Sequence, residues 1–166
     1  MFVCDTRKGK LKQCPQKAPI EKKVEAINHC FSAPTVEEIL ERLQGLIQRD
    51  ENDSESDWAR QTIETIDRMC PMSIKAIHEQ MLRARQHQTF QDCMKMEFRL
   101  GCRLWQRFDL IEGVRYVLDL KSSARPRWDP NSIKDIPLSD VLQLFRPFDD
   151  PSLEPELSFE ENAVAP

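Results

Sequence analysis

The sequence predicts an all-α chain of about six amphipathic helices, and three observations support this fold class. Apolar residues recur at helical spacing through most of residues 21–148. Helix-start motifs, in which a short oxygen-bearing side chain precedes an acidic residue by three positions, begin at Thr35, Thr89 and Asp109. The chain holds only four Gly and one Tyr, and β-branched residues seldom alternate with polar ones, so strands are poorly supported.

Composition and charge divide the chain into a helical region, residues 21–148, with two charged ends. Its 166 residues, 40% hydrophobic and 31% charged, suit a single globular domain. Residues 1–20 are basic and lack hydrophobic periodicity, so we expect a flexible head that is disordered or extended. Residues 149–166 are acidic and poor in apolar side chains, so we expect a disordered tail.

The same composition argues against several classes of partner. The basic head lacks the interleaved aromatic residues and the fold signatures of nucleic-acid binding, so we expect a solvated end and no nucleic-acid partner. No run of about 18 apolar residues is present, so we expect no membrane span. The first 20 residues lack the apolar segment of a secretory signal and are too weakly amphipathic for a convincing transit peptide.

Four helices are predicted in the first half of the helical region. The first covers Glu21–His29, and the second follows Thr35, whose cap Glu38 completes. The acid-rich stretch 49–57 lacks the central Gly and final Glu of an EF-hand, so we interpret it as a solvated loop rather than a calcium site. The third helix covers Asp57–Met69, and the fourth begins at Pro71. The stripes predicted to face the core are Val36, Ile39, Leu40, Leu43 and Ile47, then Trp58, Ile63, Ile66 and Met69, then Ile74, Ile77, Met81 and Leu82.

A further helix begins at Thr89, where Asp92 completes the cap. Its apolar face includes Glu97, and an uncompensated carboxylate on such a face is costly. We expect an ion pair to relieve that cost. The alternative is a general base with a raised pKa, which would need a second carboxylate nearby. The candidate partners for the ion pair are Arg99, Arg103 and Arg115.

The next helix runs from Asp109 to about Leu118, and Glu112 should complete its capping box. Gly113 costs about 1 kcal/mol relative to Ala inside a helix, so we infer that another backbone approaches it closely. Residues 126–130 should form a rigid extended segment anchored by Trp128. The side chains predicted to face inward are Leu110, Val114, Val117 and Leu118 here, and Val141, Leu142, Leu144 and Phe145 in a last short helix after Pro137.

Local patterns assign no catalytic residue, no metal ligand and no substrate-binding residue. The six cysteines contain no CxxC pair and complete no zinc pattern with the three histidines, so we expect free thiols in a reducing compartment. Lys75 and His78 flank an apolar stripe and could serve as bases or ligands, but neither has a partner nearby in the sequence, which favours surface roles. The thiols expected to act as small apolar fillers are Cys70, Cys93 and Cys102.

The stretch DLIEGVRYVLDLKSSARPRWDP, residues 109–130, closely resembles the C-terminal end of the 3-hydroxyisobutyryl-CoA hydrolases, members of the crotonase (enoyl-CoA hydratase) superfamily. That ending reads D-F-x-E-G-V-R-A-x-L-I-D-K followed by P-x-W-x-P. The resemblance continues upstream through MEFRL (96–100), MCPMSIK (69–75) and INHCFSAPTVEEIL (27–40), and covers about residues 27–145. The matching positions are Asp109, Glu112, Gly113, Val114, Arg115, Leu118, Lys121, Pro126, Trp128 and Pro130.

The chain departs from the family ending at a few positions. Leu110 and Tyr116 replace the usual Phe and Ala, Asp119-Leu120 stands where Ile-Asp is customary, and one extra residue precedes Pro126. These differences bear on packing around the last long helix.

The resemblance implies that this chain corresponds to the helical C-terminal part of a crotonase-like α/β fold. In that family the N-terminal half supplies the CoA pocket, the backbone amides of the oxyanion hole and the acidic residues that drive thioester hydrolysis. None of these features falls on a residue of this chain. The resemblance also implies an acyl-CoA thioester substrate, a mitochondrial role in valine breakdown and no cofactor or metal.

Two functional hypotheses follow. The first is a truncated hydrolase-like protein that is inactive alone; its partner is the missing N-terminal crotonase half or a homologous subunit, and it meets acyl-CoA only when that half is present. The alternative is a non-catalytic helical module for interaction or oligomerisation, for example a subunit of a larger mitochondrial assembly. An isolated set of such helices would expose apolar stripes that need a partner.

Overall fold

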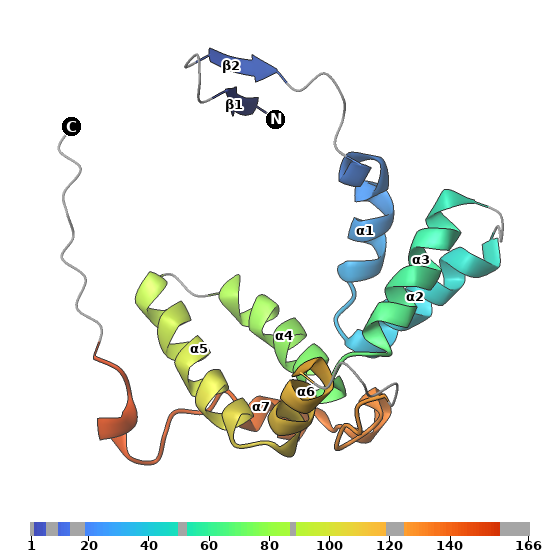
Figure 1. Ribbon diagram of the computed structural model, residues 1–166. Coiled ribbons are helices and arrows are strands. Elements are labelled where there is room, and N and C mark those ends of the chain that lie inside the picture. The colour runs from blue at the N-terminus through green and yellow to red at the C-terminus, as the bar shows by residue number, and fades with distance from the viewer. Residues whose placement is uncertain are drawn as a thin grey trace. The chain divides into compact units, whose positions relative to one another are not determined.

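A computed structural model describes residues 2–5, 10–13, 19–49, 53–86, 89–118 and 125–156 of the chain. The chain divides into two compact units, Met1–Ile63 and Glu64–Pro166, which are described in turn. The described residues form seven α-helices, drawn in Figure 1, and this confirms the all-α class predicted from the sequence.

One short pair of strands adds to the helices. Strands β1 (Phe2–Asp5) and β2 (Lys10–Gln13) are antiparallel, with Phe2 opposite Gln13 and Asp5 opposite Lys10. These strands lie in the basic head, for which the sequence predicted a disordered or extended chain. Four-residue strands are too short for hydrophobic alternation to distinguish them from other extended segments. The division of the chain at residues 20 and 148 stays a prediction.

The first unit is a small helical core. A 3-10 helix, Pro19–Lys23, leads into α1 (Val24–Phe31), followed by α2 (Val36–Arg49) and α3 (Ser54–Ile66), whose last turn enters the second unit. Phe31 and Trp58 contact each other with ring centroids 6.5 Å apart. The buried apolar residues are Ala26, Cys30, Ala33, Val36, Ile39, Leu43, Leu46 and Ala59.

Side-chain caps set the helix starts in this unit. The Glu38 amide donates to Thr35 Oγ1 at 3.2 Å, which confirms the predicted cap of α2. The Ser54 amide donates to Asp53 Oδ1 at 2.7 Å, so α3 begins three residues before the predicted Asp57. The predicted solvated loop 49–57 was therefore too long, because its acidic residues act at a helix N-terminus, where negative charge is favourable.

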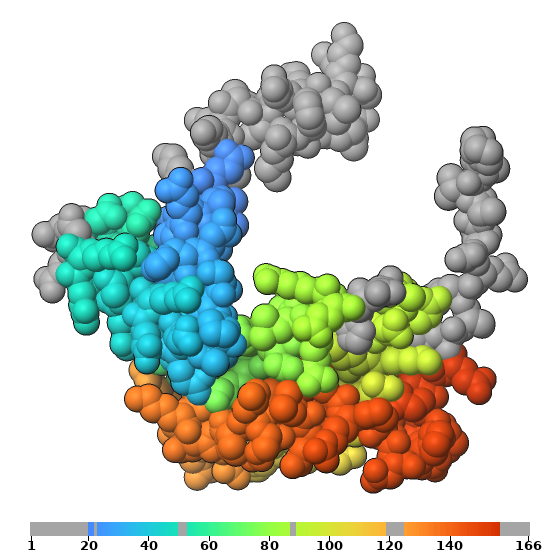
Figure 2. Space-filling view, turned by 180° about the vertical axis from the view of Figure 1, so that it is seen from behind, coloured from blue at the N-terminus to red at the C-terminus, as the bar shows by residue number. Residues whose placement is uncertain are grey.

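The second unit contains α4 (Pro71–Ala84), α5 (Phe90–Trp105), α6 (Phe108–Leu118) and α7 (Leu138–Gln143), with 3-10 turns at Ile133–Asp135 and Pro151–Leu153. Figure 2 shows the C-terminal segment, in orange, lying along the green surface of α4. Pro71 occupies the first turn of α4, and the Asp92 amide donates to Thr89 Oγ1 at 3.1 Å, so both predicted helix starts are confirmed. The core cluster comprises Met72, Ala76, Met96, Leu100, Ile136, Val141, Leu144 and Phe145.

Helix α4 turns inward a different face from the one predicted. Met72 and Ala76 are buried in the cluster, whereas Ile77 and Met81, predicted to face the core, are more than half exposed. Residues 72 and 76 lie one helical turn apart on the side of α4 that packs on α7. Helical spacing reveals apolar faces, but the neighbouring element selects which face is buried.

Part of the predicted disordered tail is ordered. Residues 149–156 are described and include the 3-10 turn Pro151–Leu153, which Asp150 caps by accepting the Ser152 amide at 2.9 Å. The disorder predicted for 149–166 was thus wrong for these first residues, because Asp150 and Glu154 find donors within the unit. Residues 157–166 lie outside the described part of the chain.

Candidate functional site

Helix α6 places acidic residues inward and apolar residues outward. Asp109 and Glu112 are buried, whereas the four side chains predicted to face the core are exposed. The prediction for this helix was therefore wrong, because the described residues around it supply hydrogen-bond donors to its acidic side and leave its apolar side exposed. The four exposed side chains are Leu110, Val114, Val117 and Leu118.

The Asp109 carboxylate joins the start of α6 to the segment that follows the helix. Asp109 Oδ1 accepts the Asp129 amide at 2.8 Å, and Oδ2 accepts Arg107 Nε at 3.1 Å. Arg107 Nη2 in turn donates to the Asp129 carbonyl at 2.6 Å. The capping box predicted at Asp109 and Glu112 is absent, because α6 begins at Phe108 and both carboxylates bind groups beyond its first turn.

The Glu112 carboxylate is occupied on both oxygens. Oε1 accepts Arg115 Nη2 at 2.7 Å and the Arg127 amide at 2.8 Å, while Oε2 accepts Arg115 Nε at 2.8 Å. This two-pronged guanidinium–carboxylate geometry is the strong form of such a pair. The Arg115 hydrogen bonds, followed by the Arg127 amide, lower the pKa of Glu112 to about 2. Glu112 is thus ionised at neutral pH and serves as an acceptor, not as a proton-transfer group.

Trp128 completes the attachment at Gly113. A Cβ atom on Gly113 would lie 3.4 Å from Trp128 Cη2, so the indole packs directly on the helix at that position. The Trp128 Nε1 donates to the Arg68 carbonyl at 3.3 Å. The predicted close approach at Gly113 therefore exists, but the neighbour is an aromatic side chain rather than a backbone. We call this assembly the α6 clamp, formed by Arg107, Asp109, Glu112, Gly113, Arg115, Arg127, Trp128 and Asp129.

Glu97, the candidate general base of α5, does not lie in the core. Its side chain is exposed, so the burial that motivated an ion pair with a neighbouring arginine is absent. Of the three arginines considered, Arg115 binds Glu112, and Arg99 Nε binds both oxygens of Glu154 at 2.8 and 3.0 Å. The hydrogen bond from Arg99 lowers the pKa of Glu154.

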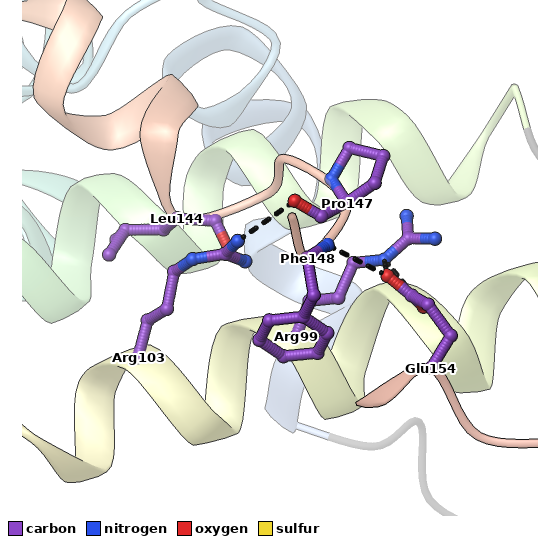
Figure 3. Close-up of polar contacts among 6 residues, drawn as sticks. All are labelled: Arg99, Arg103, Leu144, Pro147, Phe148 and Glu154. Atoms are coloured by element: carbon purple, nitrogen blue, oxygen red, sulfur yellow. Dashed lines mark hydrogen bonds and ion pairs between the residues drawn. The ribbon is translucent and has the colours of Figure 1, made fainter. Parts of the chain in front are cut away.

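The third of these arginines, Arg103, ties α5 to the chain after α7, as Figure 3 shows. Its guanidinium donates to the Leu144 carbonyl at 3.0 Å and the Pro147 carbonyl at 3.2 Å, and it stacks 4.8 Å from the centroid of the Phe148 ring. The Phe148 amide donates to Glu154 Oε1 at 3.0 Å. These contacts fix the C-terminal segment on α5, so Arg103 holds this segment in place.

A cavity of about 450 Å³ opens beside this segment. Arg103, Arg107 and Arg146 line it together with Asp140 and Asp149. Two of the three guanidinium groups already bind backbone carbonyls, and the lining contains no Cys, His, Ser or Thr. The cavity is therefore lined by groups of both charges, and its arginines act mainly as ties between elements.

The other candidates from the sequence are dispersed. Lys75 Nζ donates to the Ile136 carbonyl at 2.7 Å, so this half-buried lysine joins α4 to the end of the 3-10 turn Ile133–Asp135. The predicted surface role of Lys75 was therefore wrong, and His78 is half-buried on the same helix. Cys30 is fully buried, and burial raises the pKa of its thiol. The predicted fillers Cys70, Cys93 and Cys102 are half-buried free thiols.

The described residues hold no cluster of three or more His, Cys, Asp or Glu side chains that would bind a metal ion. Across the same residues, no helix is both long and apolar enough to cross a membrane.

Sequence reasoning missed the two arginine–carboxylate pairs of the clamp. Glu112 and Arg115 stand three positions apart, a spacing that places them on one helix face, and this was the available signal. The contact of Asp109 with Asp129 joins residues twenty positions apart and has no local signal.

Comparison with known proteins places these features in context. The family described as enoyl-CoA hydratase/isomerase matches residues 3–145. Over 127 residues the chain is 34% identical to mitochondrial 3-hydroxyisobutyryl-CoA hydrolase of Homo sapiens, covering 76% of this chain and 30% of that protein. Over 150 residues it is 29% identical to 3-hydroxyisobutyryl-CoA hydrolase-like protein 5 of Arabidopsis thaliana, covering 88% of this chain and 37% of that one.

A solved structure is also similar. The crystal structure of a carnitinyl-CoA dehydratase from Mycobacterium thermoresistibile matches with a TM-score of 0.72 and 26% identity, covering 91% of this chain and 39% of that chain. The chain thus spans about a third of the length of the curated relatives it matches.

Proposed function

Because this chain belongs to the enoyl-CoA hydratase/isomerase family, we propose that it forms the helical part of a 3-hydroxyisobutyryl-CoA hydrolase-like protein that acts on acyl-CoA thioesters. One observation carries the proposal. Among the positions that carry the sequence resemblance to those hydrolases, Gly113 contacts Trp128 and Glu112 contacts Arg115 within the α6 clamp. Asp109 and Glu112 also accept the two backbone amides that flank Trp128. A shared motif whose members contact one another supports a shared local structure.

The proposed role is structural, with the chemistry carried by another part of the fold. Each oxygen of both clamp carboxylates accepts a hydrogen bond, and Glu97 is exposed. Thioester hydrolysis needs hydrogen-bond donors placed to stabilise the oxyanion of the transition state. One such donor lowers the activation free energy by about 2.7–4 kcal/mol. We therefore expect the chain to need an N-terminal crotonase half or a homologous subunit as its partner. Its proposed location is the mitochondrion, because several relatives are named as mitochondrial hydrolases.

Thiol release tests this proposal. The purified chain, incubated with 3-hydroxyisobutyryl-CoA, should release CoA no faster than buffer, whereas human 3-hydroxyisobutyryl-CoA hydrolase serves as the positive control. Addition of the segment of the human enzyme that this chain does not match should raise the rate above that of either component alone. Clear turnover by the isolated chain would contradict the assignment of the chemistry to another part of the fold.

A second candidate function is a non-catalytic interaction module, for example within a larger mitochondrial assembly. The exposed apolar side of α6 favours it, because monomeric proteins seldom leave such a side uncovered. Light scattering after size-exclusion chromatography distinguishes the two. Self-association with weak thermal cooperativity supports the module, and a monodisperse monomer with a sharp melting transition argues against it.

A further inference from the structure

A short acidic segment, residues 147–156, contacts α5 in the second unit, and we call it the strap. Its sequence, PFDDPSLEPE, carries four acids and no basic residue. The side chains from Asp149 to Leu153 are exposed, and Leu153 is 56% exposed. Phe148 and Glu154 are half-buried, and both contact α5. These two side chains are therefore the main anchors of the strap.

The carboxylate anchor binds a basic side of α5. Arg99 Nε donates to both oxygens of Glu154, at 2.8 and 3.0 Å. Lys95 and Arg103 stand four positions before and after Arg99, so the three cations share one side of the helix. The hydrogen bond from Arg99 and, to a smaller extent, the charge of Lys95 lower the pKa of Glu154, so both cations act on this carboxylate. We call Lys95, Arg99 and Arg103 the basic stripe of α5.

The aromatic anchor lies on the next turn of the same stripe. The Arg103 guanidinium lies 4.8 Å from the centroid of the Phe148 ring, and the Phe98 ring meets that ring edge-on at 6.1 Å. Arg103 Nη2 also donates to the Pro147 carbonyl at 3.2 Å. The Phe148 amide donates to Glu154 Oε1, so the strap bends back and presents both anchors together, as Figure 3 shows. An arginine cluster is a common means of recognising acidic peptides, and arginine also stacks on aromatic rings.

The strap can leave this side of α5 while the core stays packed. None of its residues, all of which the structure describes, belongs to the buried apolar cluster of the unit, whose last member is Phe145. A segment with few buried apolar contacts opens locally while the rest of the unit stays folded. The ion pair of Arg99 with Glu154 remains accessible to solvent, since the two side chains are 22% and 18% exposed. Opening of the strap uncovers the basic stripe and the Phe98 ring.

We propose that the basic stripe of α5 is a docking surface for an acidic segment of a partner protein, and that the strap is its built-in competitor. The partner segment supplies an aromatic ring to Arg103 and a carboxylate to Arg99. The strap itself carries this inference, because it has the opposite charge and fills both positions. Since a partner binds only the open chain, the strap reduces the apparent affinity in proportion to the open fraction. The inference does not depend on the proposed function.

Binding of the strap sequence as a separate peptide tests the proposal. The probe is fluorescein-labelled PFDDPSLEPE, and fluorescence anisotropy measures its binding to the full chain. The double variant Phe148→Ala/Glu154→Gln removes both anchors and releases the strap. It should bind the peptide about tenfold or more tightly than the wild type, as expected for a strap that is open in about a tenth of the wild-type molecules or fewer. Rising salt should weaken this binding, because salt screens exposed charges.

Matched controls separate the stripe from general charge attraction. In the double variant, a further Arg99→Gln should lower the affinity about tenfold. Arg60→Gln should leave it unchanged, since Arg60 pairs with Asp57 in the first unit. A peptide with Ala and Gln at its two anchor positions keeps three of its four acids, and it should bind about tenfold more weakly than the original peptide.

Several outcomes would overturn the proposal: no binding to the double variant, equal binding to the wild type, equal binding of the altered peptide, or an unchanged affinity with Arg99→Gln. Tighter binding of a single-stranded oligonucleotide than of the peptide would refute the choice of partner. If circular dichroism shows that the double variant has lost helix, amide hydrogen exchange of the wild-type chain decides. The amides of Leu153 and Glu154 should then exchange about tenfold faster than that of Leu100, and equal rates would refute a releasable strap.

Discussion

Gly113 provides the most direct test of the α6 clamp, because it can be compared with Gly101, a second helical glycine of the same unit that has no side chain packed on it. Trp128 lies against Gly113, whereas a Cβ atom on Gly101 of α5 would meet nothing within 4 Å. Replacing Gly by Ala in a helix interior stabilises it by about 1 kcal/mol. A contact at 3.4 Å is ordinary for a Cβ atom, so we expect Gly101→Ala and Gly113→Ala to raise the free energy of unfolding by similar amounts.

The larger substitution separates the two sites. Gly101→Leu should stabilise the chain almost as much as Gly101→Ala, because Leu is a good helix former and the site is open. Gly113→Leu must displace the indole, which adds an overpacking cost of about 1–3 kcal/mol and the loss of the Trp128–Arg68 hydrogen bond, about 0.5–1.5 kcal/mol. We expect a net destabilisation of about 0.5–3.5 kcal/mol after the gain in helix propensity.

Urea unfolding followed by far-UV circular dichroism measures all four variants. Equal stability of Gly113→Leu and Gly101→Leu would refute the packing of Trp128 on α6, and with it the explanation given for this glycine. A destabilised Gly113→Ala would show that the indole lies closer to the helix than 3.4 Å.

Three further predictions concern the clamp and the first unit. The pKa of Glu112 is lowered from 4.5 to about 2, so the stabilisation that its ionised carboxylate contributes is complete above pH 4.5 and is lost as the pH falls towards 2. Urea midpoints across that range should fall less steeply for Glu112→Gln than for wild type, and parallel curves would count against the ion pair. Leu43→Ala should lower the free energy of unfolding by about 2–5 kcal/mol, because Leu43 is fully buried. Leu40→Ala on the same helix should cost less than half as much, because Leu40 is half-buried. Equal losses in urea unfolding would contradict the different burial of these two leucines in the structure. Cys30 should resist alkylation in the folded chain and react in urea, because burial both shields its thiol and raises its pKa. The half-buried Cys102 should react faster than Cys30 in the folded chain, and peptide mass mapping that finds the two modified at the same rate would refute the burial of Cys30.

The sequence alone determined where three of the helices begin and which family the chain resembles. Thr35, Pro71 and Thr89 specify helix starts through atoms within three or four residues, so their effect is local and the structure contains each of them. The motif around Glu112 and Trp128 likewise identified the hydrolase family before any contact was known. The three helix starts need no knowledge of the rest of the fold, because their interacting groups are neighbours along the chain.

The tertiary structure alone decided which helix faces are buried. Helical spacing on α4 and α6 located the apolar stripes correctly, but both stripes were predicted to face the core and are largely exposed. On each helix a different face is buried, and residues distant in the sequence contact that face. Val141, Leu144 and Phe145 select Met72 and Ala76 on α4, and Asp129 with the Arg127 amide draws the acidic side of α6 inward. Burial is a property of two surfaces in contact, so a periodic sequence specifies one surface and leaves its partner undetermined.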